Sequence, residues 1–149
     1  MSKKKYKVGY TTGVYDLFHI GHLNILKNAK AQCDYLIVGV STDDLVESYK
    51  NKRPIIPYEE RKPIVESIKY VDEVVPQMTM DKFVAWQKLH FDALFHGDDW
   101  KNSDMYNKYM EDFSGTGVEL VFLPHTEGTS STMLTEVLQT IRERECAKF

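Results

Sequence analysis

The sequence predicts an α/β protein in three layers, with a central, mostly parallel five-stranded sheet covered by helices on both faces. Two observations indicate this fold class. Apolar strand-like segments alternate with segments of helical period along almost the whole chain. Residues 35–40, Tyr-Leu-Ile-Val-Gly-Val, form a continuous apolar run, as expected of a strand buried on both faces. A chain of 149 residues can bury its own core, so we expect a single domain over residues 1–149.

The first half of the chain is expected to hold two strands and three helices. Leu23, Leu26 and Ala29 recur at helical spacing, and hydroxyl and carboxyl groups are typical of a helix start. Two prolines and several basic residues indicate a loop at Asn51–Pro57. The expected elements are a strand at Tyr6–Tyr10, a helix from His19 or Ile20 to Ala31, a strand at 35–40, a helix that is capped within Ser41–Asp44 and leads to Tyr49, and a helix opened by Pro57–Glu60.

The second half of the chain continues the alternation. Ile64, Val65 and Ile68 are expected on one face of the helix after Pro57. The next helix is expected to turn its apolar residues inward, namely Phe83, Val84 and Leu89. The remaining elements are strands at Val71–Val75, Phe91–Phe95 and Val118–Leu123, a helix at Asp81–Leu89, and a last helix capped by Ser130 or Ser131 that runs through Leu134, Val137, Leu138 and Ile141.

The composition excludes several classes of function. With a formal net charge of −3, the protein has no broad attraction for nucleic acid or acidic membranes, so any anion site must be local. No apolar run could span a bilayer, and no hydrophobic signal region follows the basic residues 1–5. Cys33 and Cys146 belong to no motif, which favours a reduced cytoplasmic protein over one with a disulfide.

Residues with unusual chemistry follow four of the expected strands. In parallel α/β sheets, ligands bind beyond the carboxyl ends of the strands, at the point where the strand order switches. Four such segments at one sheet edge therefore predict a binding site. They are His19 with His22, Ser41–Asp43, Gly97–Trp100, and His125–Thr132.

The segment Thr12–His22 is the most informative of these. It places two imidazoles where a strand ends and a helix begins, and a helix start offers unpaired N–H groups suited to a phosphate. Gly21 allows a close approach to the backbone. A structural histidine pair is the alternative interpretation. A zinc site lacks a suitably spaced third ligand. We favour phosphate chemistry, in which imidazole N–H groups stabilise charge that develops on phosphoryl oxygens.

Other polar residues have two interpretations each. Asp16 is expected mainly to hold its turn by bonding to backbone groups. The cluster of Lys50, Lys52 and Arg53 is either a solvated surface or a flap over the sheet edge. Arg61 opens a helix, where a cation gains nothing from the helix dipole, so a ligand contact is expected.

Two further segments are expected to contact the ligand. Gly97–Trp100 is either a plain turn or a site for a ribose, a base or Mg²⁺, with Trp100 as an apolar wall. His125–Thr132 is either an ordinary helix cap or a second phosphate cradle made of hydroxyls and backbone N–H groups.

Taken together, these segments resemble the HxGH nucleotidyltransferase superfamily, within it the cytidylyltransferases, and most of all the bacterial glycerol-3-phosphate cytidylyltransferases. The His-x-Gly-His element marks the superfamily. The Gly-Asp-Asp-Trp and Thr-Glu-Gly-x-Ser-x-Thr elements are narrower and indicate CTP. The matching segments are Thr12–His22, Asp34–Asp43, Tyr58–Val75, Gly97–Trp100 and Thr126–Thr132.

The resemblance implies a Rossmann-like fold, a homodimer, and a reaction of CTP with an alcohol phosphate that requires Mg²⁺ and yields a CDP-alcohol and pyrophosphate. The expected product, CDP-glycerol, would serve teichoic acid or capsule precursor synthesis. The resemblance implies His19, His22, Lys50 and Arg61 as catalytic residues, and Thr11, Thr12, Gly13, Tyr15, Asp16, Gly21, Lys52, Gly97, Asp98, Asp99, Trp100, His125, Thr126, Glu127, Gly128, Thr129, Ser131 and Thr132 as substrate- or CTP-binding residues.

The chain departs from the family pattern at His125, where the family usually has Arg. A neutral imidazole does not replace a fixed guanidinium charge. Thr129 and Ser131 are milder departures, from Ile and Thr. Two alternatives therefore stay open: a cytidylyltransferase for a ribitol, ethanolamine or sugar phosphate, and a nucleotide-binding regulatory module without turnover. The acceptor pocket is expected to depend on Lys101, Asp104, Tyr106 and Tyr109.

Overall fold

Five parallel strands form one sheet in the order β3-β2-β1-β4-β5. The structure is a computed structural model, and it describes residues 4–97, 104–124, 126, 128 and 130–147, with only the backbone of the last two. Since β1 pairs with β2 on one side and β4 on the other, the strand order switches between β1 and β4. The strands are β1 (Tyr6–Gly13), β2 (Cys33–Ser41), β3 (Glu73–Gln77), β4 (Ala93–Gly97) and β5 (Glu119–Leu123).

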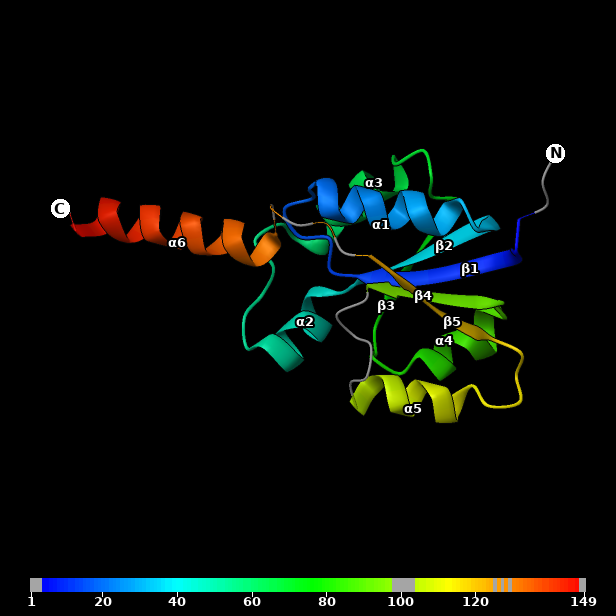
Figure 1. Cartoon of the computed structure of the whole chain (residues 1–149). Coiled ribbons are helices and arrows are strands. Elements are labelled where there is room, and N and C mark those ends of the chain that lie inside the picture. The colour runs from blue at the N-terminus through cyan, green and yellow to red at the C-terminus, as the bar shows by residue number, and fades with distance from the viewer. Residues whose placement is uncertain (1–3, 98–103, 125, 127, 129, 148–149) are drawn as a thin grey trace.

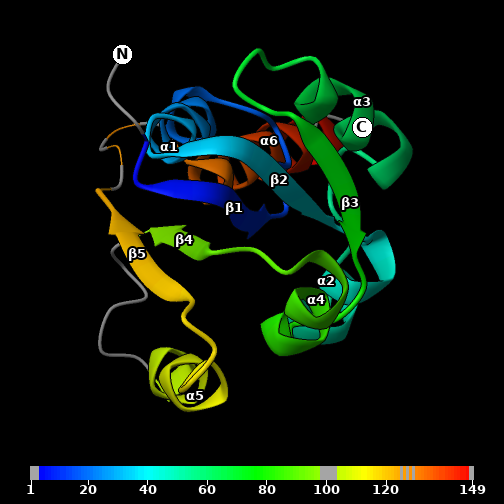
Figure 2. The ribbon, with the colours of Figure 1, turned by 90° about the vertical axis from the view of Figure 1, so that its right-hand side faces the viewer.

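Helices lie on both faces of this sheet, which confirms the predicted three-layer α/β fold (Figure 2). One layer contains α1 (Ile20–Lys30) and α3 (Tyr58–Glu66), and the other contains α2 (Asp43–Lys50), α4 (Lys82–Leu89) and α5 (Asp104–Asp112). The last helix, α6 (Ser131–Ala147), extends away from the sheet (Figure 1). No helix within the described residues has the length and apolar character needed to cross a membrane.

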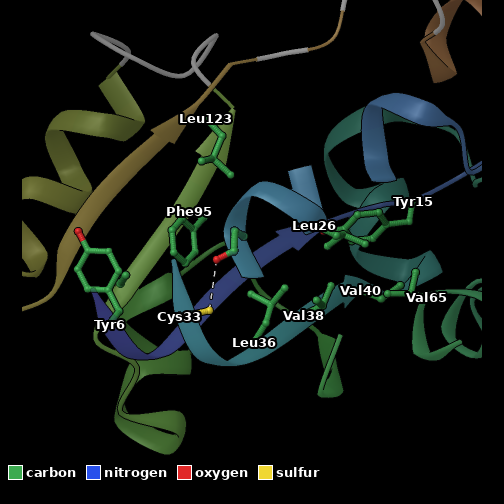
Figure 3. Close-up of a cluster of buried hydrophobic side chains, with 12 residues drawn as sticks. Tyr6, Tyr15, Leu26, Cys33, Leu36, Val38, Val40, Val65, Phe95 and Leu123 are labelled. Atoms are coloured by element: carbon green, nitrogen blue, oxygen red, sulfur yellow. Dashed lines mark hydrogen bonds between the residues drawn. The ribbon is translucent and has the colours of Figure 1, made fainter. Parts of the chain in front are cut away.

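The core consists of two apolar clusters, one on each face of the sheet. On the α1 side, one cluster of buried side chains includes Leu26, Leu36, Val38 and Phe95 (Figure 3). On the α4–α5 side, a second cluster includes Tyr10, Ile37, Phe91, Leu94, Tyr109 and Phe113. Alternate residues of β2 therefore point into different clusters, which explains why residues 35–40 are apolar without interruption.

The cysteine in this core is a free thiol. Cys33 is fully buried and its sulfur lies 3.4 Å from the backbone oxygen of Ala29 (dashed line in Figure 3). The side chain of Cys146 lies outside the described residues.

Local capping explains where several helices begin and end. The Thr42 hydroxyl accepts the N–H of Leu45 at 3.2 Å, so the predicted cap of α2 is confirmed. Asp81 caps α4 by accepting the N–H of Phe83 at 3.0 Å. Asn51 and His90 end these two helices in the left-handed conformation. The hydroxyl of Ser130 accepts the N–H of Met133 at 3.0 Å at the start of α6, as predicted.

Several predicted details were wrong. Val84 was expected inside, yet it is 40% exposed, because Phe83 takes the inward position beside it. Ile64 was expected on one face with Val65, yet it is 45% exposed while Val65 is buried. The helix α5 was not predicted. Its sequence is mostly charged or polar, and Tyr109 is its one fully buried residue among those described. On α6, the side chains of Val137, Leu138 and Ile141 are about half exposed.

Candidate active site

A cavity of about 700 Å³ opens at the carboxyl edge of the sheet. It lies where β1 and β4 end, at the switch in strand order, as the fold class predicts. Most of the predicted site residues line it together: Thr11, Thr12, Gly13, Tyr15, Asp16, His19, Gly21, His22, Lys50, Lys52, Gly97, Thr126, Ser131 and Thr132.

Not all the predicted residues can be placed there. Asp98, Asp99, Trp100, His125, Glu127 and Thr129 lie outside the described residues. Gly128 is exposed, has a φ of 108°, and is not among the residues that line the cavity.

The two imidazoles form a reciprocal cap at the start of α1. Nδ1 of His19 accepts the N–H of Gly21 at 3.0 Å, and Nδ1 of His22 accepts the N–H of His19 at 3.2 Å. This is the geometry of a capping box, with histidines in place of the usual Ser or Thr and Glu. The rings stack with their centroids 3.9 Å apart. The bonds that begin the helix therefore also orient both rings.

This arrangement determines which nitrogen carries the proton. Because Nδ1 accepts a hydrogen bond in each ring, a neutral ring holds its proton on Nε2. Burial lowers the pKa of His19, and burial together with the neighbouring His19 lowers the pKa of His22 to about 3. Near pH 7 both rings are therefore neutral Nε2–H donors, which suit phosphoryl oxygens.

Gly21 is required by this geometry. A Cβ at this position would lie 2.9 Å from Cε1 and 3.1 Å from Nδ1 of His19. Any larger residue would therefore have to push the His19 ring away. The glycine between the histidines thus makes room for a ring of the protein itself.

The turn before α1 has an unusual backbone. Tyr15 and Leu17 adopt φ angles of 56° and 51°, in the left-handed region that glycine usually occupies. The Tyr15 ring is buried and packs edge-on against His22 at 5.3 Å, and Phe18 lies 5.2 Å from His22. The packed aromatic rings support both the strained turn and the imidazole.

Asp16 ties this turn to the loop after α2. Its carboxylate accepts the backbone N–H groups of Ile55 at 2.8 Å and Ile56 at 2.9 Å. Its backbone oxygen accepts the Ser131 hydroxyl at 2.6 Å. The predicted turn-holding role matches these contacts, although they reach distant segments as well as the turn itself.

Positive charge dominates the lining of the cavity. Of the described residues that line it, Lys50, Lys52, Arg53 and Lys82 are cationic, and Asp16 is the one acid. Arg53 is already paired with Glu47 at 2.5 Å and Asp44 at 3.3 Å. Within the described residues, Lys50 and Lys52 make no ion pair, so their charge is available to an anionic ligand.

Arg61 occupies a different place from the one predicted. Its guanidinium is buried under the site and does not line the cavity. It donates to the backbone oxygens of Ile56, Val14 and Ser41 at 2.6–2.8 Å, and to Asp43 at 2.7 Å. Burial opposes ionisation of Asp43, but the hydrogen bonds from Arg61 and from the Tyr58 N–H outweigh it and lower the pKa of that carboxyl. The acceptors that Arg61 contacts are backbone carbonyls and the Asp43 carboxylate, so it supports the site from beneath.

Lys82 is a functional candidate that the sequence analysis missed. It is the first residue of α4, it is 2% exposed, and it lines the cavity. Among the described residues its ammonium has no hydrogen-bond or ion-pair partner. A buried charge without a partner is costly, so burial lowers the pKa of Lys82 to about 7. Such a group suits a ligand that brings its own negative charge.

The hydroxyl-rich residues connect the start of α6 to the rest of the site. Thr126 accepts a hydrogen bond from the Asn24 side chain at 2.9 Å, which fixes this segment on α1. Thr132 is exposed at the start of α6 and lines the cavity. The Thr11 hydroxyl, in contrast, donates to the backbone oxygen of Phe95 at 3.0 Å and joins β1 to β4.

No group of three or more metal-ligating side chains occurs among the residues that the structure describes. The one carboxylate they place on the cavity, Asp16, already accepts two backbone N–H groups.

Comparison with known proteins establishes the class of protein. A family model described as cytidylyltransferase-like matches residues 10–137. The chain therefore belongs to the cytidylyltransferase-like family, an assignment that agrees with the paired imidazoles at the strand switch.

Individual relatives refine this assignment. The chain is 40% identical over 126 residues to a glycerol-3-phosphate cytidylyltransferase of Bacillus spizizenii, which covers 83% of this chain and 91% of that protein. It is 43% identical over 88 residues to the ethanolamine-phosphate cytidylyltransferase of Mus musculus, which covers 58% of this chain and 22% of that protein. Among solved structures, a lipopolysaccharide core biosynthesis protein of Thermoplasma volcanium shares the fold, with a TM-score of 0.70 at 24% identity over 82% of this chain and 99% of that one.

Proposed function

We propose that the protein transfers a cytidylyl group from CTP to glycerol 3-phosphate, giving CDP-glycerol and pyrophosphate. The observation that carries this proposal is one cavity that combines two neutral imidazole donors with Lys50 and Lys52, which make no ion pair with any described residue. The choice of acceptor is supported by the relatives. Those named glycerol-3-phosphate cytidylyltransferase are 37–40% identical to this chain and match nearly their whole length.

The reaction needs no nucleophile from the protein. A phosphate oxygen of the acceptor attacks the α-phosphorus of CTP, a new P–O bond forms, and the bond to the leaving pyrophosphate breaks. Catalysis then consists of positioning two anions and stabilising the charge that develops between them. Mg²⁺, when it binds with the triphosphate, supplies further charge neutralisation.

The residues of the cavity divide these tasks in the proposal. His19 and His22 donate their Nε2–H groups to phosphoryl oxygens of CTP, while Lys50 and Lys52 neutralise charge near the α-phosphate. Lys82 holds the acceptor phosphate, because its buried ammonium has no partner among the described residues. Thr132 offers its hydroxyl to the CTP phosphates at the start of α6, while Ser131, whose hydroxyl donates to the Asp16 backbone oxygen, holds this segment against the imidazole turn.

A direct assay tests the proposal. The purified protein is incubated with Mg²⁺, CTP and glycerol 3-phosphate, and pyrophosphate and CDP-glycerol are quantified. Parallel reactions replace the acceptor with ethanolamine phosphate, ribitol 5-phosphate or a sugar phosphate, and replace CTP with ATP. Turnover with another acceptor alone would contradict the assignment of glycerol 3-phosphate. CTP binding without turnover on any acceptor would favour a regulatory module.

Two further properties belong to the proposal. We infer a homodimer, as the family resemblance implies, and a location in the cytoplasm, which the two cysteines without a motif favour. Light scattering of the purified protein tests the dimer, and fractionation of cells tests the location. A monomer at assay concentrations with full activity would contradict the dimer as a functional unit.

A further inference from the structure

His96 stands at the end of β4 and lines the same cavity from the other side of the sheet. His19 and His22 come from the α1 side, whereas the ring of His96 lies against α5. The walls of the cavity in this region also include Met80, Lys82 and Met105. No step of the proposed reaction uses the imidazole of His96.

The His96 ring packs against a buried aromatic side chain of α5. It stacks on the ring of Tyr109, with centroids 5.7 Å apart and planes only 4° from parallel. Tyr109 is itself 2% exposed, and its hydroxyl donates to the backbone oxygen of Met80 at 3.1 Å. An imidazole fixed in this way presents its edge to a ligand at little cost in side-chain entropy.

The charge state of His96 limits what it can recognise. Burial, together with the neighbouring Lys82 cation, lowers the pKa of His96 to about 3, so the ring is neutral. A neutral imidazole is a donor at one nitrogen and an acceptor at the other. A hydroxyl group matches this pair of properties, since it also donates and accepts. A phosphate dianion only accepts, and an ammonium group only donates and is repelled by Lys82.

We propose that His96 contacts a hydroxyl group of the acceptor and makes the site selective for polyol phosphates. This inference rests on the proposed function, because it assigns the alcohol part of the same acceptor whose phosphate Lys82 holds. Lys82 and His96 then contact opposite ends of the same small molecule. Met80 and Met105 offer apolar contact to its carbon atoms.

The test pairs a change in the protein with a change in the acceptor. His96→Leu removes the hydrogen-bonding edge, and propyl phosphate is an acceptor of similar length without hydroxyls. We expect His96→Leu to lower kcat/KM for glycerol 3-phosphate by about 10- to 100-fold, the effect of losing a partner for a buried polar group. For propyl phosphate we expect a change of less than about threefold, and the KM for CTP should stay near its wild-type value. His96→Gln, which retains both a donor and an acceptor, should recover part of the loss.

The outcomes separate this inference from the proposed function. Equal losses of kcat/KM for both acceptors in His96→Leu would show a structural role and overturn the inference, as would an unchanged kcat/KM for glycerol 3-phosphate. In both cases the proposed function stands, because wild-type protein still forms CDP-glycerol. Wild-type protein that turns over neither acceptor would overturn the proposed function and the role of His96 with it.

Discussion

The carboxylate of Asp16 accepts the backbone N–H of Ile55 at 2.8 Å, across 39 residues of sequence. This bond joins the turn that carries the imidazoles to the loop that follows Lys50 at the end of α2 and carries Lys52. The Asp16 side chain therefore helps to position both the loop that carries Lys52 and the two imidazoles.

Replacing Asp16 should uncouple these two parts. In Asp16→Ala both backbone N–H groups lose their acceptor, and we expect kcat/KM for CTP to fall about tenfold or more, as for loss of hydrogen bonds to a charged group. Steady-state kinetics with CTP as the varied substrate measure the effect. Asp44→Ala is a matched control, because Asp44 also contacts this loop through Arg53 but is 91% exposed in its side chain. Equal effects of the two substitutions would contradict the coupling role of Asp16.

His22 combines a capping role with a donor role, and two variants separate them. In His22→Ala we expect kcat to fall by roughly 100-fold or more, the usual effect of losing a preorganised donor. His22→Gln can still accept the His19 N–H at this position of the helix, so it should restore the stability lost in His22→Ala but not the rate. Urea unfolding and kcat measure the two effects. A near-normal kcat in either folded variant would refute the donor role.

Gly21→Ala should separate local helix stability from catalysis. Alanine favours a helix over glycine by about 1 kcal/mol, yet its Cβ would meet the His19 ring at 2.9 Å. We expect kcat to fall while the melting temperature stays level or rises. A crystal structure of the variant should show the His19 ring displaced. Full activity would mean that the ring position is not critical.

Lys82 should give the acceptor reaction a distinctive pH dependence. Burial favours the neutral amine, so the pKa of Lys82 falls to about 7 and its charge is lost as the pH rises through that value. We expect kcat/KM for the acceptor to decline above about pH 7, because this ratio reports the free enzyme. Lys82→Arg, whose guanidinium stays charged, should flatten the decline, and Lys82→Ala should raise the KM for the acceptor far more than that for CTP. An acceptor profile that is flat from pH 6 to 9 in the wild type would contradict this role.

Arg61 should matter for stability before it matters for chemistry. Its side chain is 0% exposed, and its removal takes the donor from three backbone carbonyls and leaves the Asp43 carboxylate without its guanidinium partner. We expect Arg61→Ala to lower the free energy of unfolding by about 3 kcal/mol or more, with little rescue by Arg61→Lys. Arg53→Ala, which removes an exposed cation from the same region, should change it by less than about 1 kcal/mol. Chemical denaturation compares the three variants, and similar values for all three would contradict the buried role of Arg61.

The order of elements and the place of the site could be predicted because they depend on strong local signals. Apolar runs defined the strands, and the glycine-containing imidazole turn marked the strand switch. The helix α5 could not be predicted, because its mainly polar sequence depends on Tyr109, which packs on His96 and other distant residues.

Arg61 and Lys82 show a limit of arguing from charge and helix position. Both are cations in the first turn of a helix, where the dipole disfavours them, and the same argument applies to each. In the structure Arg61 meets carbonyl groups of the protein, whereas Lys82 lines the cavity. Whether such a cation binds a group of the protein or faces a ligand depends on which backbone segments surround it in the folded chain.

The hydrogen bond from Ser131 to the backbone oxygen of Asp16 spans 115 residues of sequence. During synthesis on the ribosome, all five strands emerge before the segment that completes this contact. A nascent chain that stops short of Ser131 would thus contain the strands of the sheet but lack the residues that close the cavity over the imidazole turn. Termination before Ser131 would therefore remove the hydroxyl that binds the Asp16 carbonyl, together with the residues of α6 that line the cavity.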